Sequence, residues 1–293
     1  MKDYIEKYIP DVTDEQMRRW EASNALECMT LDGEKRYFRN AGPNLFRVDS
    51  ACYDIKTAKE GTALSGSEQV NKENLPEIIA AVKKDKKAIV APKRMRVTYT
   101  LTVDTNAVPA GKMIRCWLPY PRKDQSRQTD VKFISASEPE YVFSPQDCRH
   151  STLYMEKRAV KGEPTVFSET FEYTSCGEWH NLRAEDVQPY DTATALYKEY
   201  TAEREKHIIF SPRLRELAAK LTAGENNPYL KAKRIFRWVN DNFPWASARE
   251  YSTIENIPEY VLDNRHGDCG QVSLLFITLC RISGIPAHSR AVS

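Results

Sequence analysis

A helical spacing of apolar residues stands out near the end of the chain. Its apolar residues recur at i, i+3, i+4, i+7 and i+8, as on the buried face of a helix: Val272, Leu275, Phe276, Leu279 and Cys280. Asp268 is a favourable N-cap residue before this run, and Ser283-Gly284 provides a stop after it. The pattern therefore predicts a mostly buried helix whose first turn contains Cys269.

The middle of the chain changes to alternation of apolar and polar residues. Five runs follow this period of two, separated by loops rich in Pro, Asp, Ser and Gly: 94–103, 113–118, 131–134, 152–155 and 166–173. Short strands at such intervals are typical of an antiparallel β-sandwich, which we predict over residues 92–185. Its aromatic positions could bind a ligand, but aromatic residues in strands usually pack, which favours a structural role.

Helical patterns return after the predicted sandwich. Ser211-Pro212 and Asn227-Pro228 each place an N-cap residue before a proline at the first helical position. Pro244 ends the second of these helices, and the polar stretch 245–256 is predicted to be a loop over a cleft. These helices and the Cys269 helix form a third predicted domain, residues 186–293.

The first 91 residues are predicted to be a helical and irregular region. Thr13 begins a helix, whereas residues 30–70 are expected to be loops and short strands, with Leu45-Phe46-Arg47-Val48 among them. Leu75-Pro76-Glu77 is expected to open a short helix that runs through Val82. The fold class is therefore α+β.

Composition limits the classes of partner that we expect for this chain. The 293 residues suffice for more than one buried core, and 43 basic against 41 acidic residues leave a formal charge of +2. This balance provides no bulk field for nucleic acid, and without an apolar run of 18 residues we predict no membrane span. The N-terminus lacks the apolar core of a signal peptide, so the protein is expected to be cytoplasmic as written or a trimmed form of an exported protein. The seven cysteines do not decide between these, and the localisation stays unknown.

Cys269 is the strongest candidate for chemistry. The free N–H groups at a helix N-terminus stabilise an anion, so a thiol placed there ionises more easily. Gly270 leaves room for a substrate backbone to approach the sulfur, and first-turn N–H groups can hold an oxyanion. The alternative is an ordinary small core cysteine, which is the common state of a free thiol. The glycine-flanked turn favours the nucleophile.

Two further roles are considered for residues near this turn: a zinc site and a histidine base. His266-x-x-Cys269 has part of a zinc spacing, but zinc needs three or four ligands and no second Cys/His pair is near, so we expect no metal and no cofactor. A thiol nucleophile also needs a base, and His266, His288 and His180 are the histidines considered for it. His266 lies too close in sequence for good alignment, whereas His288 follows the helix and could approach the thiol.

The residues around Cys269 also resemble the nucleophile segment of the transglutaminase-like superfamily, which has a papain-like thiol core. The resemblance covers about residues 228–289 and rests on Gly267-Asp268-Cys269-Gly270, Leu275, Leu279, Arg281, Gly284-Ile285-Pro286-Ala287, and upstream on Ala232, Ile235, Phe236, Trp238, Val239 and Asn242-Phe243. It implies a thiol enzyme that forms a thioester from a glutamine or peptide carbonyl and passes the acyl group to an amine or to water. It also implies an aromatic residue beside the oxyanion, for which Trp245 is the candidate, although packing explains Trp245 equally well.

In this superfamily a histidine and then an aspartate follow the cysteine on later strands, and the sequence stops at Ser293 before either. We therefore expect the helical, N-terminal part of a transglutaminase-like core, with His288 as the remaining candidate base and almost no turnover. The shortened core is also expected to expose a strand edge that favours self-association. The predicted function is transglutaminase-like acyl transfer or amide hydrolysis on a protein or peptide. The alternative is a non-catalytic binding or assembly protein that uses the sandwich and a vestigial thiol core.

Overall fold

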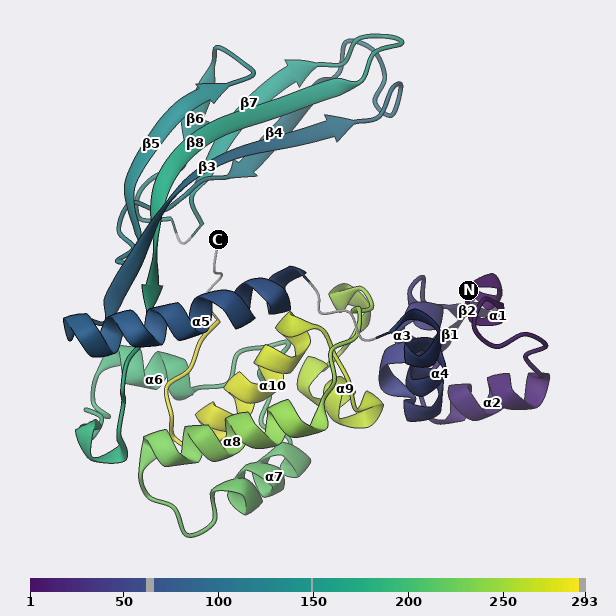
Figure 1. The fold of residues 1–293 in the computed structure, drawn as a ribbon. Coiled ribbons are helices and arrows are strands. Elements are labelled where there is room, and N and C mark those ends of the chain that lie inside the picture. The colour runs from purple at the N-terminus through teal and green to yellow at the C-terminus, as the bar shows by residue number, and fades with distance from the viewer. Residues whose placement is uncertain (62–65, 149, 290–293) are drawn as a thin grey trace. The chain divides into compact units, whose positions relative to one another are not determined.

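The computed structural model describes residues 1–61, 66–148 and 150–289, and it combines helices with antiparallel sheets (Figure 1). The predicted α+β class is therefore confirmed. Contacts divide the chain into two compact units: Met1–Ala63 together with Leu182–Arg290, and a second unit that runs from Leu64 to Asn181. The division into three domains at residues 91 and 185 stays a prediction. Within the described ranges, no helix combines the length and hydrophobicity needed to traverse a bilayer.

The N-terminal part of the first unit is a small helical cluster with one hairpin. Its elements are α1 (Lys2–Glu6), α2 (Asp14–Ala22), β1 (Cys28–Leu31), β2 (Glu34–Tyr37), α3 (Ala41–Val48) and α4 (Ser50–Glu60). As predicted, Thr13 begins a helix: its hydroxyl accepts from the Gln16 backbone N–H at 3.2 Å. Trp20, Leu45 and Phe46 are almost completely buried in the cluster's core.

Two expectations for this region were wrong. Residues 30–70 are not only loops and short strands: Leu45-Phe46-Arg47-Val48 lies in helix α3, and residues 50–60 form helix α4. Ala41, Leu45 and Val48 have helical spacing, which a four-residue window does not separate from alternation. The short helix expected from Leu75 is the second half of α5 (Gly66–Asp85), which continues through Pro76. Its first half carries no apolar stripe that could have signalled a helix.

The second unit contains α5 and the predicted antiparallel sandwich. Its strands are β3 (Ile89–Val103), β4 (Met113–Pro119), β5 (Gln128–Ala136), β6 (Tyr141–Phe143), β7 (Thr152–Arg158) and β8 (Thr165–Glu178). They form two three-stranded sheets, β3-β8-β5 and β4-β7-β6 (Figure 1). All five predicted runs lie in strands, whereas β6 is too short for its period to be recognised.

The sandwich core lies between the two sheets. Leu153 and Met155 from one sheet and Phe167 from the other are fully buried. Along β8 the inward positions Thr165, Phe167, Glu169 and Phe171 alternate with half-buried ones, which is the alternation that the sequence showed. Glu169 is the exception among these inward residues, since a carboxyl group occupies an apolar core.

The remainder of the first unit is helical. Its helices are α6 (Ala195–Thr201), α7 (Pro212–Thr222), α8 (Pro228–Asn242), α9 (Ile257–Asn264) and α10 (Cys269–Ile282), with short 3-10 turns at Ala184–Asp186 and Tyr251–Thr253. The predicted caps are present: the Ser211 hydroxyl accepts from Leu214 N, and the Asn227 side chain accepts from Leu230 N, both at 3.2 Å.

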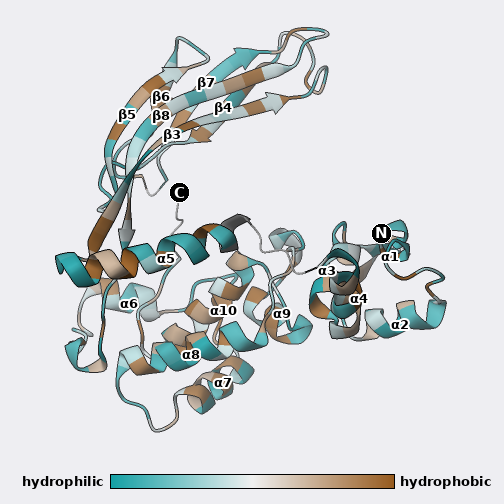
Figure 2. Cartoon of the chain, viewed as in Figure 1, coloured by the Kyte–Doolittle hydropathy of each residue, from teal (hydrophilic) through white to brown (hydrophobic). Residues whose placement is uncertain are grey.

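Helix α10 is the centre of this helical part. It packs against α6, α7, α8 and α9, and hydrophobic residues are frequent along it (Figure 2). Of its five predicted core residues, Leu275, Leu279 and Cys280 are buried, while Val272 and Phe276 are partly buried and pack against the same core. The surrounding helices thus fix the helix whose first residue is Cys269.

Candidate active site

Cys269 is the first residue of α10, and its side chain is exposed. The turn before it is closed by a reciprocal cap, because the Asp268 carboxylate accepts from Gln271 N at 2.8 Å and the Gln271 side-chain oxygen accepts from Asp268 N at 3.1 Å. Arg265 adopts the left-handed conformation (φ 59°) that ends α9. This cap holds the thiol at the positive end of a 14-residue helix.

Tyr251 lies over the glycine that follows the thiol. Its hydroxyl donates to Asp268 Oδ1 at 2.5 Å, and a Cβ added at Gly270 would collide with that hydroxyl. Burial, followed by the hydrogen bond to Asp268, raises the pKa of Tyr251, with a smaller contribution from Cys269. The phenol is therefore a neutral donor near pH 7, and glycine at 270 is required by this close approach rather than by backbone strain.

We expect Gly270→Ala to destabilise the protein by about 1–3 kcal/mol, because the new methyl group displaces Tyr251 from its hydrogen bond with Asp268. Adding Tyr251→Phe removes the colliding oxygen, so the double variant should recover part of that loss. Urea unfolding of wild type, both single variants and the double variant measures this coupling. A cost of Gly270→Ala that is the same with tyrosine and with phenylalanine at 251 would contradict the assigned contact.

Trp245 is held beside the thiol turn through its backbone. It forms a parallel bridge with Gly267, in which Ala246 N donates to Gly267 O at 3.1 Å. Trp245 is 52% exposed, and the Arg47 guanidinium lies 4.8 Å from its ring centroid. The structure thus brings Trp245 to the turn that carries Cys269.

His266 is buried under the same turn and does not reach the thiol. Its Nδ1 donates to the carbonyl oxygen of Asn264 at 2.8 Å, since a carbonyl can only accept. Burial lowers the pKa of His266, which keeps the ring neutral near pH 7. Its Nε2 is buried and has no hydrogen-bond partner among the described residues.

His288 is placed away from Cys269, near the other end of α10. Its ring stacks on Tyr200 at 4.7 Å, and Ala287 O accepts from the guanidinium of Arg281 at 2.8 Å. Arg281 is twelve residues beyond Cys269, which corresponds to roughly 18 Å along a helix.

His180, the third histidine considered as a base, lies in the second unit and pairs with Glu178 at 2.8 Å. Across the described ranges, no three His, Cys, Asp or Glu residues are grouped to hold a metal ion.

Residues far upstream support the loop beside the thiol, and sequence patterns did not identify them. Asn44 is buried and clamps Ser247: its amide nitrogen donates to Ser247 O, and its oxygen accepts from Ser247 N, both at 2.9 Å. The nearest sequence signal was the apolar run Leu45-Phe46-Arg47-Val48 directly after Asn44, which we predicted to be a strand or loop. These two hydrogen bonds, to the backbone N–H and C=O of Ser247, fix the position of the loop at this residue.

Glu27, a buried acid of the N-terminal cluster, provides a second attachment to the segment that precedes the thiol turn. Glu27 accepts from the Tyr260 hydroxyl at 2.7 Å and forms an ion pair with Arg249 at 3.2 Å. Burial, and then the charge of Glu27, raise the pKa of Tyr260. Residues from the N-terminal cluster thus contact both the 245–251 loop and α9, which precede the thiol turn in the sequence.

Comparison with known proteins gives one family match. Residues 215–291 match the family model of the transglutaminase-like superfamily. No curated protein sequence matches this chain significantly. Among solved structures, a protein from Cytophaga hutchinsonii named "putative cysteine protease" is similar, with 18% identity and a TM-score of 0.49. That alignment covers 68% of this chain and 66% of the other, just under two thirds of its length. The segment that contains Cys269, residues 215–291, is therefore a transglutaminase-like segment.

Proposed function

We propose that Cys269 is the thiol nucleophile of this transglutaminase-like segment, acting on a glutamine or amide carbonyl of a protein or peptide. The observation that carries the proposal is its position: an exposed thiol at the first residue of a buried, capped helix. The two buried cysteines that lie in helices, Cys52 and Cys280, have their pKa raised to about 12, chiefly by burial. Such thiols are poor nucleophiles near neutral pH.

The proposed reaction has two halves. In the first, the thiolate attacks the carbonyl carbon, and the tetrahedral oxyanion collapses to a thioester as the C–N bond breaks. Ammonia or an amine leaves with one added proton. In the second half, an amine or water attacks the thioester and releases the thiol. First-turn N–H groups of α10 are suitable donors to the oxyanion.

Trp245 and Tyr251 are proposed to flank the reacting carbonyl. The backbone of Trp245 is bridged to Gly267, and the Tyr251 hydroxyl lies against Gly270. Trp245 would supply an aromatic wall, while Tyr251 would keep Asp268 oriented as the helix cap. Tyr251 is in this scheme a positioning residue, because it acts through Asp268.

Proton transfer is the demanding step. Of the described histidines, His266 is turned toward Asn264 and His288 toward Tyr200, so neither is aligned with Cys269. His288 stays the proposed base only if the segment after Ala287 moves. With neither histidine aligned, we propose that this arrangement captures an acyl group with little turnover, since removal of the base in comparable triads costs roughly four to six powers of ten in rate.

The test is acylation by a p-nitrophenyl ester, followed by intact mass and peptide mapping. A thioester adduct is expected on Cys269 and should be absent from Cys269→Ala. Cys148→Ala is the matched control, because Cys148 is also exposed but lies in the sandwich unit. An adduct that persists in Cys269→Ala and disappears in Cys148→Ala would overturn the proposal.

A further inference from the structure

A cavity of about 550 Å³ lies in the sandwich unit, far in sequence from Cys269. Two loops form its walls: residues 120–124, which follow β4, and residues 144–148 with Ser151, which precede β7. Its size is within the range of cavities that hold small ligands. This cavity is independent of the proposed thiol chemistry.

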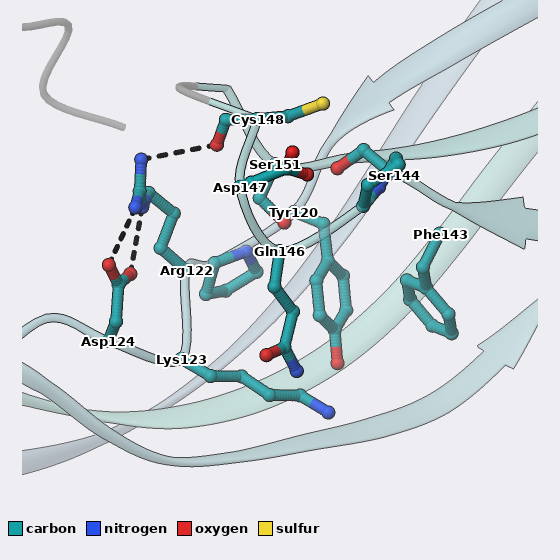
Figure 3. Close-up of a pocket in the computed structure, with 12 residues that line it drawn as sticks. Tyr120, Arg122, Lys123, Asp124, Phe143, Ser144, Gln146, Asp147, Cys148 and Ser151 are labelled. Carbon is teal, nitrogen blue, oxygen red and sulfur yellow. Dashed lines mark hydrogen bonds and ion pairs between the residues drawn. The ribbon is translucent and has the colours of Figure 1, made fainter.

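The floor of the cavity is aromatic. The rings of Tyr120 and Phe143 lie with centroids 4.8 Å apart at 58° (Figure 3). Phe143 is 39% exposed, while only 4% of Tyr120 is exposed. Tyr120 is anchored through its backbone, since its N–H donates to Ser151 O at 2.9 Å. The exposed part of the Phe143 ring can therefore receive an apolar side chain, while the buried Tyr120 ring supports Phe143 from within.

The two walls are tied together by Arg122. Its guanidinium donates to both carboxylate oxygens of Asp124, at 2.8 and 2.6 Å, and across the cavity to Cys148 O at 3.2 Å (Figure 3). The paired guanidinium lowers the pKa of Asp124. The charges of Arg122 and Asp124 therefore cancel locally, and both side chains serve to hold the loops.

The remaining polar groups of the cavity are available to a ligand. Among the described residues, Lys123, Gln146 and Asp147 line the cavity with no hydrogen bond or ion pair of their side chains. Figure 3 shows Lys123 and Gln146 extending toward the hydroxyl end of Tyr120, while Asp147 comes from the loop of Cys148. The 120–124 loop thus offers a cation, Lys123, and the loop that precedes β7 offers a neutral amide, Gln146, and an anion, Asp147.

We propose that this cavity binds a free amino acid that carries an apolar side chain. The ligand's carboxylate is bound by Lys123, with Gln146 and the Tyr120 hydroxyl as further donors, and its ammonium group by Asp147. The apolar side chain lies on Phe143. A purely anionic ligand would be opposed by Asp147, and a purely cationic one by Lys123.

The test uses the full chain and four probes: phenylalanine, its amide, N-acetylphenylalanine and glycine. Calorimetric titration is expected to give phenylalanine a Kd of about 0.1–1 mM, in keeping with the limits on binding energy for a ligand of about twelve heavy atoms. Each of the other three, which lacks one charge or the side chain, should bind about tenfold more weakly.

Variants assign the two charges. Lys123→Met should bind phenylalanine and its amide alike, and Asp147→Asn should bind phenylalanine and N-acetylphenylalanine alike. Lys161→Met, an exposed lysine of the same unit that does not line the cavity, should leave all four affinities unchanged. Both tested side chains are exposed, so the variants are expected to fold, which circular dichroism verifies. Equal affinity of wild type for the three phenylalanine probes, or no binding of any probe at about 10 mM, would overturn the proposal.

Discussion

Iodoacetamide is expected to alkylate Cys269 at least about a thousand times faster than Cys280 at about pH 7.5. Both cysteines lie on α10, but Cys269 is exposed at its start, whereas Cys280 is 1% exposed near its end. Burial raises the pKa of Cys280 to about 12. Its thiolate population near neutral pH is therefore about three powers of ten below that of a free cysteine.

Peptide mapping after brief labelling measures the two rates in one sample. Labelling in concentrated urea is the control, because unfolding removes the burial of Cys280 and should make the rates similar. Exposed Cys148 gives an internal reference for a thiol in the sandwich loops. Similar rates for Cys269 and Cys280 in the native chain would contradict the placement of Cys269 at an accessible helix terminus.

Glu169→Gln is expected to raise the free energy of unfolding of the sandwich by about 3 kcal/mol at pH 8 and to change it little at pH 4.5. Glu169 is 1% exposed on β8, and neither carboxylate oxygen has a hydrogen-bond partner among the described residues. Burial raises the pKa of Glu169 from 4.5 to about 7. An unpaired carboxylate in an apolar core is costly, so the carboxyl group is retained in its neutral form where pH allows.

The direction of this pH dependence follows from the pKa of Glu169 in the unfolded and folded states. The folded state binds the carboxyl proton more tightly than the unfolded state. The stabilisation from this bound proton is therefore fully present below about pH 4.5 and is lost as pH rises through about 7. The amide introduced by Glu169→Gln cannot ionise, so the variant does not lose this stabilisation at high pH.

Urea unfolding, followed by the β-sheet signal in circular dichroism at both pH values, measures this difference. Glu172→Gln is the matched control, because Glu172 is paired with Arg94 and Arg96 at the surface of the same strand. The same stabilisation by Glu169→Gln at both pH values would show that packing, not ionisation, is responsible.

Much of the fold could be predicted because its signals are local. The strand at 94–103, the alternation in β8 and the caps at Ser211 and Asn227 depend on a few neighbouring residues, and the structure has each of them. The errors arose where local signals conflict or are absent. In α3 a short apolar run fits two periods, and in the first half of α5 polar residues form a helix with no apolar stripe.

The sequence by itself determined the position of the thiol. Asp268, Cys269 and Gly270 specify a capped helix start, because a cap requires only residues within one turn of each other. The tertiary structure decided what surrounds it. Tyr251 reaches Asp268 across 17 positions, and Asn44 reaches Ser247 across 203, so no local period encodes either contact. It also decided that His288 stacks on Tyr200 instead of approaching Cys269. Such pairings depend on how helices and loops pack, which is fixed only when the whole unit folds.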